Sequence, residues 1–187
     1  MADTALTSLR RPTDTRERSR RAGVTAAIAL GASLGDRLRT LHLAVRALDA
    51  RPDLAVVKCS RVYATAPVGG VAHQGFLNAV VRVETTLEPR ALLGVCKELE
   101  VRLGRRPARS WADRVVDLDI LLWDSRIVSE PDLRVPHPRL AERDFFLACL
   151  AEAWPAAPNP WTGLRWADTL PVRRRWPVAG VLPAPLP

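Results

Sequence analysis

The sequence predicts an α+β fold, in which helices cover an antiparallel sheet, because strand-like and helix-like segments alternate along the chain. Four short runs are rich in apolar and β-branched residues and are bounded by Gly or Pro, at 24–30, 54–63, 76–85 and 117–123. Two segments between them, 34–48 and 89–103, repeat apolar residues at helical spacing. The order β-α-β-β-α-β is the split βαβ arrangement of a ferredoxin-like domain.

The first half of this pattern is a strand, a helix and a strand pair. The run at 24–30 ends at Gly31, which suits a buried strand. The helix that follows has one apolar stripe with arginines off it, made by Leu34, Leu38, Leu41, Val45 and Leu48. A loop with Pro67 and two glycines separates the runs at 54–63 and 76–85, so we expect these two strands to pair antiparallel.

The second half adds a helix, a strand and a further helix. Pro89 suits the first turn of a helix and Gly104 its C-terminal end, and one face carries Leu92, Cys96, Leu99 and Leu103. An arginine-rich loop at 105–114 leads into the fourth strand. Residues 139–153 are predicted to form an additional C-terminal helix, and several Trp residues beyond it indicate an irregular segment packed by aromatic rings.

Most of the net charge lies at the two ends of the chain. The formal charge is +8, but residues 1–22 and 171–187 contribute +3 each, which leaves 23–170 nearly neutral. We therefore predict a disordered basic leader at 1–22, a domain at 23–170 and a Pro- and Arg-rich tail at 171–187, and this distribution does not favour nucleic acid as a partner. A transit peptide is an alternative interpretation of 1–22, although its acidic residues argue against it.

The remaining composition indicates a cytoplasmic protein. No stretch approaches the roughly 18 apolar residues that a membrane span requires, and no signal peptide is recognisable. Cys59, Cys96 and Cys149 are far apart and lack metal-ligand spacing, so we expect buried, reduced thiols.

Asp117-Leu-Asp119 is the most informative short motif. Side chains two positions apart on a strand share a face, so both carboxylates point the same way, while Val116, Leu118, Ile120 and Leu122 would occupy the other face. Two hard oxygen ligands at this spacing suit one or two Mg²⁺ ions that hold a polyphosphate. Acidic residues on the solvent side of a strand are also ordinary, so the motif alone leaves both interpretations open.

Nine short motifs follow one another between residue 24 and about residue 160, and each alone is weak. They are 31–37, 63–69, 76–79, 104–105, Trp111, Arg114, 117–121, 135–137 and 143–145. In this order they resemble the 6-hydroxymethyl-7,8-dihydropterin pyrophosphokinase family. The resemblance implies a ferredoxin-like fold and transfer of the terminal diphosphate of ATP to the pterin hydroxymethyl group in folate biosynthesis, with release of AMP.

The resemblance also implies roles for single residues. Asp117 and Asp119 would hold two Mg²⁺ ions on the phosphates of ATP, and Arg105 and Arg114 join them as catalytic residues. Pterin contacts are implied for Thr65, Phe76, Asn78 and Phe145. A carboxamide offers both a donor and an acceptor to the pterin edge, and Phe rings offer flat faces. For Phe146 we keep the interpretation of a core residue.

Nucleotide contacts are implied for Arg105, Trp111, Arg114, Ile120, His137 and Arg143. Outside this match, a run of arginines is usually a solvated loop and a His in a turn usually lies at the surface. Trp111 is expected in a mobile loop, residues 105–114, that closes over the nucleotide.

The chain departs from the family at a few positions. Relatives commonly have Trp-Gly-Pro-Arg where this chain has Trp111-Ala-Asp-Arg114, and Asp113 brings an acidic group toward the phosphates. Asp132 and Pro138 also replace residues that often contact nucleotide.

Two alternatives to an active pyrophosphokinase stay open. One is a family member with impaired catalysis, because of the altered loop. The other is a ferredoxin-like RNA-binding module, although two carboxylates on the strand face would repel phosphate unless a metal intervened. We expect a monomer whose partners are ATP and the pterin, without nucleic acid or membrane.

Overall fold

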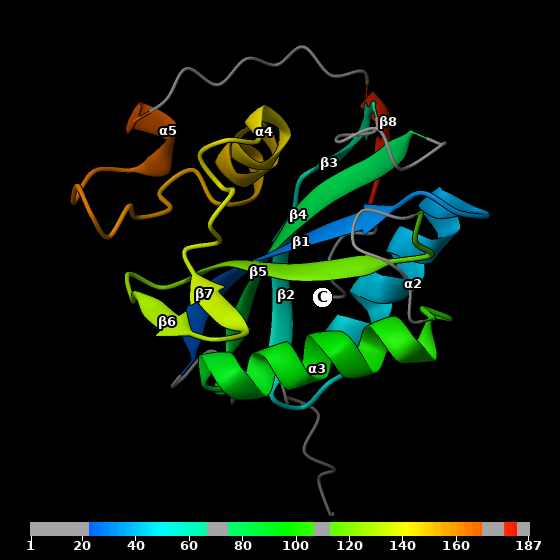
Figure 1. Ribbon diagram of the computed structural model, residues 1–187, viewed down its shortest axis with the longest axis horizontal. Helices are drawn as coiled ribbons and strands as arrows, with labels where there is room; N and C mark the ends of the chain where they lie inside the picture. Colours follow the sequence, from blue (N-terminus) through cyan, green and yellow to red (C-terminus); the bar gives the residue numbers. More distant parts are fainter. Residues whose placement is uncertain (1–22, 67–74, 107–112, 170–177, 183–187) are drawn as a thin grey trace, which may run out of the picture.

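The computed structural model describes residues 23–66, 75–106, 113–169 and 178–182 and has one main sheet with helices on both faces (Figure 1). The sheet consists of β1 (Val24–Ala32), β2 (Leu54–Cys59), β3 (Arg61–Thr65), β4 (Phe76–Thr85), β5 (Asp117–Trp123) and β8 (Val178–Val181). Its order is β5-β1-β4-β3-β8, with β2 also paired to β4, and all pairs are antiparallel. Together with helices α2 (Arg37–Asp49) and α3 (Pro89–Arg102), this confirms the predicted ferredoxin-like α+β fold.

The centre of the sheet is the pair β1 and β4, which are in register over the whole of β1, from Val24 opposite Thr85 to Ala32 opposite Leu77. On its other side β1 pairs with β5. Gly31 therefore has Asn78 as its neighbour on one strand and Asp117 on the other. This row of three residues becomes the floor of the candidate site.

Helices α2 and α3 cover one face of the sheet, over a core that includes Ile28, Leu30, Leu41 and Leu99. The carboxylate of Asp36 accepts the Arg39 N–H at 3.1 Å, so α2 begins only after this cap and not at Leu34. Helix α3 begins at the predicted proline, and Gly104 (φ +97°) lies just beyond its end in a conformation that suits glycine.

Helix α4 (Asp144–Ala153) packs on the opposite face, over Ala27, Ala29 and Val80. The prediction that this helix begins at residue 139 was wrong, because residues 137–143 form turns. The N–H of Arg139 donates to Nδ1 of His137 at 3.1 Å, and the N–H of Leu140 donates to the His137 carbonyl at 2.9 Å. These bonds hold the chain in a bend around His137 before α4 begins.

The predicted single strand at 54–63 is two strands, because Ser60 interrupts it. The Ser60 N–H donates to the Val80 carbonyl at 2.8 Å, and its Oγ accepts the Val80 N–H at 2.9 Å. Both β2 and β3 pair with β4, so the expected antiparallel pairing is confirmed, while the continuity of the strand is not.

Strand β5 contains a bulge that sequence alternation does not reveal. Ile120 lies opposite Ile28 and Leu122 opposite Ala27, so Leu121 is an extra residue. Val116, Leu118 and Ile120 pack toward α2 and α3 as predicted, but Leu122 lies in the cluster under α4. The assignment of Leu122 to the first face was wrong because the bulge shifts the alternation.

The last described strand lies beyond the predicted domain boundary at residue 170. β8 pairs with β3, with Arg61 opposite Val181, so part of the expected tail belongs to the sheet. Before it come the hairpin of β6 (Val128–Glu130) and β7 (Leu133–Val135) and the short helix α5 (Trp166–Thr169), next to the buried Trp154. The expected leader, residues 1–22, lies outside the described residues.

Two further predictions concern the thiols and the membrane. Cys96 and Cys149 are buried, as expected, whereas Cys59 is half-buried, and none of the three forms a disulfide. Burial raises the pKa of each thiol to about 12. Within the described residues, no helix is long and apolar enough to cross a bilayer.

Candidate active site

A cavity of about 390 Å³ opens on the part of the sheet that α4 does not cover. Its floor includes the row Asn78, Gly31 and Asp117 across β4, β1 and β5. A Cβ at Gly31 would lie 3.2 Å from Oδ1 of Asn78, so glycine leaves room for that carboxamide. The cavity brings together nine predicted site residues, which are Thr65, Phe76, Asn78, Arg114, Asp117, Asp119, His137, Arg143 and Phe145.

One side of the cavity is built from an amide and aromatic rings. Asn78 is buried and donates through Nδ2 to Oγ1 of Thr65 at 2.8 Å, which fixes the orientation of its carboxamide. Phe76 lines the same side, and Phe145 contacts Phe146 edge to face with ring centroids 4.6 Å apart. An oriented amide among ring faces suits a flat heterocycle with a polar edge.

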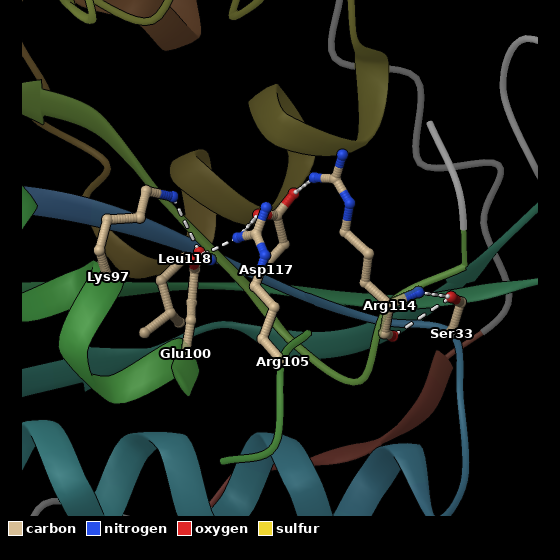
Figure 2. A network of polar contacts seen from close by, with 7 residues as sticks. All are labelled: Ser33, Lys97, Glu100, Arg105, Arg114, Asp117 and Leu118. Carbon is tan, nitrogen blue, oxygen red and sulfur yellow. Dashed lines mark hydrogen bonds and ion pairs between the residues drawn. The ribbon is translucent and has the colours of Figure 1, made fainter. Parts of the chain in front are cut away.

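The other side carries two carboxylates from β5, and arginines hold the first of them (Figure 2). Oδ1 of Asp117 accepts from Nη1 of Arg105 at 2.7 Å, and Oδ2 accepts from Nη1 of Arg114 at 2.7 Å. Ser33 fixes the backbone of Arg114, because its Oγ accepts the Arg114 N–H at 2.8 Å and its N–H donates to the Arg114 carbonyl at 2.9 Å. Hydrogen bonds to the backbone and ion pairs therefore position the charges of this side.

Asp119 lies on the same face of β5, two residues further along. Burial, together with the negative charge of Asp117, raises the pKa of Asp119 to about 6. Two carboxylates that disfavour each other's charge are a suitable site for a cation that both can contact.

Next to this pair lies a third carboxylate, which the sequence analysis missed. Glu100 of α3 is 1% exposed, and its Oε1 accepts the Leu118 N–H at 2.7 Å and Nζ of Lys97 at 3.0 Å. It also forms an ion pair with Nη1 of Arg105. The available signal was a charged residue four positions after Cys96, on the apolar face of the helix.

His137 and Arg143 close the cavity opposite the sheet. Nδ1 of His137 accepts the Arg139 N–H, so the proton of the neutral ring lies on Nε2. Burial and the nearby charge of Arg143 lower the pKa of His137 to about 4, so the ring is neutral at pH 7. The guanidinium of Arg143 lies 5.0 Å from the ring centre of Phe146, which lines the cavity and is also 4% exposed, in agreement with a core role.

A second cavity of about 390 Å³ adjoins the first and shares Asp119, His137 and Pro138 with it. It lies between α3, β5 and the hairpin of β6 and β7, and the predicted nucleotide residue Ile120 lines it. Its other walls combine apolar and cationic side chains, which are Leu93, Leu133, Lys97 and Arg134.

Asp132 of the second cavity is held by a neighbour. Its Oδ2 accepts from Nη1 of Arg90 at 2.7 Å, and the same arginine pairs with Glu130. The pKa of Asp132 is lowered by its hydrogen bond to Arg90. The carboxylate of Asp132 is therefore held by Arg90, which it shares with Glu130.

Of the predicted site residues that the structure describes, Arg105 and Ile120 do not line the first cavity. Arg105 reaches the site only through Asp117 and Glu100, and Trp111 lies outside the described residues, as does most of the predicted mobile loop. Arg139, which sequence reasoning did not single out, does line the cavity.

Comparisons with known proteins agree on one family. The model of the family 7,8-dihydro-6-hydroxymethylpterin-pyrophosphokinase matches residues 27–155. A 2-amino-4-hydroxy-6-hydroxymethyldihydropteridine pyrophosphokinase of Bacillus subtilis is 43% identical over 127 residues, 68% of this chain and 76% of the relative. Its counterpart in Methylorubrum extorquens is 42% identical over 130 residues, 70% and 82% of the two chains.

A solved structure shows the same fold at low identity. The crystal structure of Plasmodium falciparum HPPK-DHPS A437G with SDX-DHP superposes with a TM-score of 0.62 at 15% identity. It covers 83% of this chain and 49% of that chain, so the likeness concerns about half of the larger protein.

Proposed function

The chain belongs to the 7,8-dihydro-6-hydroxymethylpterin-pyrophosphokinase family, and we propose that ATP and the pterin react in the cavity on the open part of its sheet. The enzyme is a pyrophosphokinase of folate biosynthesis, which transfers a diphosphate group from ATP to hydroxymethyldihydropterin. The roles of single residues, the metal and the assembly state form the rest of the proposal.

The observation that carries this proposal is the row Asn78, Gly31 and Asp117. Adjacent strands lie about 4.8 Å apart, so the backbones of Asn78 and Asp117 are about 10 Å apart across Gly31, and both side chains lie next to this glycine. A two-ring substrate whose polar edge meets Asn78 would lie over Gly31 and direct its hydroxymethyl arm toward the Asp117 side. Phe76 and Phe145 would hold the ring faces, and Thr65 orients Asn78.

Asp117 and Asp119 are the residues that would hold two Mg²⁺ ions. Mg²⁺ takes few carboxylate ligands from a protein and keeps substrate phosphates and water as the others, which suits two side chains on one strand face. Burial and the negative charge of Asp117 raise the pKa of Asp119, and a bound cation would offset both effects. When bound, Mg²⁺ would neutralise charge on the phosphates and favour attack at the β-phosphorus.

Arginine and histidine side chains would position the triphosphate. Arg114 and Arg143 line the cavity, and the fork of a guanidinium matches phosphate oxygens. His137 stays neutral at pH 7 and carries a proton on Nε2, so it is a donor without charge. Holding both substrates in line lowers the entropy cost of the reaction, which needs no covalent enzyme intermediate.

The second cavity would receive the adenosine part of ATP. It adjoins the first at Asp119 and His137, so a nucleotide could extend from one into the other. Ile120 and Leu133 offer apolar walls to a base, and Lys97 offers a cation. The alternative of an RNA-binding module has no such support, because carboxylates line the open sheet face.

Removal of the two carboxylate charges tests the proposal. Asp117→Asn and Asp119→Asn should each lower the rate of AMP release about a hundredfold or more, because several kcal/mol of metal-dependent charge stabilisation is lost. Asp168→Asn, which breaks an exposed ion pair with Arg165, serves as the control and should leave the rate unchanged. Near-normal rates in both site variants would contradict the proposed metal site.

We further propose that the enzyme is a cytoplasmic monomer. Residues of one chain are sufficient to line both cavities, and none of its three cysteines forms a disulfide. Light scattering after gel filtration should give the mass of one chain, and a stable dimer would contradict this.

A further inference from the structure

Glu100 is a buried carboxylate that the proposed reaction does not use. It lies on α3, next to the strand that carries Asp117, and only 1% of it is exposed. Burial of a charge is costly unless partners compensate, and Glu100 has three of them. They are the Leu118 N–H at 2.7 Å, Nζ of Lys97 at 3.0 Å and Nη1 of Arg105.

These contacts form a chain of alternating charges that leads into the cavity. Figure 2 shows the order Lys97, Glu100, Arg105, Asp117 and Arg114, and each neighbouring pair is an ion pair. Nη1 of Arg105 contacts both Glu100 and Asp117, so this guanidinium lies between a buried carboxylate and one that lines the cavity. Only Asp117 of the two carboxylates can be reached from the cavity.

We propose that Glu100 is a positioning residue, which holds Arg105 beside the reacting phosphates when Asp117 no longer does. This inference rests on the proposed function. If Asp117 turns to ligands in the cavity, Arg105 loses one of its two described anchors and keeps Glu100. The guanidinium then stays at the cavity edge with one side of its fork directed to phosphate oxygens, instead of moving into solvent.

The hydrogen bond between Glu100 and the Leu118 N–H also helps to position the site. Leu118 is the residue between the two aspartates, and its backbone N–H is fixed by the same carboxylate that holds Arg105. Glu100 thus ties the cation and the aspartate-bearing strand to one rigid helix.

Glu100→Gln tests this with little change in shape. The carboxamide oxygen still accepts the Leu118 N–H, whereas the charge that holds Arg105 is lost. We expect kcat for AMP release to fall by about tenfold to a hundredfold, since misplacing a positioned group costs about this much. KM for the pterin should change less than about twofold, because the Asn78 side is untouched. Titration calorimetry should show weaker binding of a non-hydrolysable ATP analogue.

A double-mutant cycle with Arg105→Ala separates positioning from a general structural effect. If Glu100 acts through Arg105, Glu100→Gln should change kcat and analogue binding less than about twofold in the Arg105→Ala background. Equal fold losses in both backgrounds would overturn the inference while the role of Arg105 stands. A normal rate in Arg105→Ala alone would instead overturn the proposed role of Arg105, and the inference with it.

Glu152→Gln is a matched control. Glu152 also accepts a strand N–H, that of Arg61 at 3.1 Å, and also pairs with an arginine, but neither residue lines the cavity. We expect a lower melting temperature with unchanged kcat. If Glu100→Gln does not fold, Glu100→Asp is used in the same cycle, because it keeps the charge but shortens the reach to Arg105. If Glu100→Asp lowers kcat by the same factor with and without Arg105→Ala, the inference is likewise overturned.

Discussion

The two halves of one sheet face differ in what covers them and in the residues they present. Under α4 the strand positions on this face are buried, small and apolar, with Ala27, Ala29 and Val80 packed with the helix. Beyond α4 the same strands and the same face present Gly31, Asn78 and Asp117 to the cavity. The comparison teaches that the site exists because the helix stops short, so that polar positions of a continuous sheet remain open to ligands.

The polar contacts of the two halves differ in the same way. Under α4, Glu152 accepts from the Tyr63 hydroxyl at 2.5 Å and pairs with Arg61, which fastens the helix to β3. In the open half, Arg105 and Arg114 hold Asp117, and all three groups are partly exposed. One network joins a helix to the sheet, whereas the other lies at the cavity, where Asp117 and Arg114 are open to ligands.

The largest effect on stability should come from the covered half. Leu150→Ala, in α4, removes a side chain that is 1% exposed, and it should lower the free energy of unfolding by about 2–5 kcal/mol. Substrate KM values should stay unchanged below the melting temperature. Leu43→Ala, at a position that is 45% exposed, is the control and should lower stability much less. Urea unfolding measures both. A KM change in Leu150→Ala would show that the two halves are coupled.

The open half should lose ligand affinity instead of stability. Asn78→Ala should weaken pterin binding by about 1–3 kcal/mol, because the polar edge of the ring loses its partner, with little change for ATP. Calorimetric titration of each ligand separates the two effects. Equal losses for both would show that Asn78 supports the sheet and not the pterin.

The pH dependence should also distinguish the open half. The pKa of Asp119 is raised to about 6, so its carboxylate becomes protonated as the pH falls through 6, and binding of Mg²⁺ with an ATP analogue should weaken by up to about tenfold per pH unit below that value. The raised carboxyl pKa of Asp119 by itself favours the folded state as the pH falls from 6 toward 4. The lowered pKa of His137, about 4, has the opposite effect, because the unfolded state binds that proton first, so the net change in folding stability over this range should be small. In Asp119→Asn, binding of Mg²⁺ with the ATP analogue should depend less on pH. If binding to the unmodified protein does not change with pH, the role of Asp119 as a metal ligand is contradicted.

The smallest change should come from the residue between the two ligand-binding groups. Gly31→Ala adds a Cβ that would lie 3.2 Å from Oδ1 of Asn78, so the carboxamide must move by a few tenths of an ångström. We expect a rise of several-fold in KM for the pterin and little change for ATP. Gly94→Ala, where a Cβ meets no atom within 4 Å, is the matched control. Unchanged pterin kinetics in Gly31→Ala would show that the cavity floor tolerates the shift.

Local pattern was sufficient for the order of the elements and for most of the site. Apolar spacing and the flanking Gly and Pro residues are properties of neighbouring positions, so the helix at Pro89 and the strand at Asp117 could be predicted. The motifs around Asn78 and Asp119 could be matched to a family for the same reason. The bulge at Leu121 and the strand β8 could not be predicted, because both depend on a partner strand distant in the sequence.

The sequence by itself determined that two carboxylates share one face of a strand, because this follows from their spacing, and its short motifs were sufficient to indicate a family. Only the tertiary structure decided that α4 leaves Gly31 uncovered. It also decided that Glu100 forms an ion pair with Arg105, which in turn pairs with Asp117. The physical reason is that burial and ion pairing depend on which elements pack together. Glu100 and Asp117 are 17 positions apart in the chain and meet at one guanidinium in the fold.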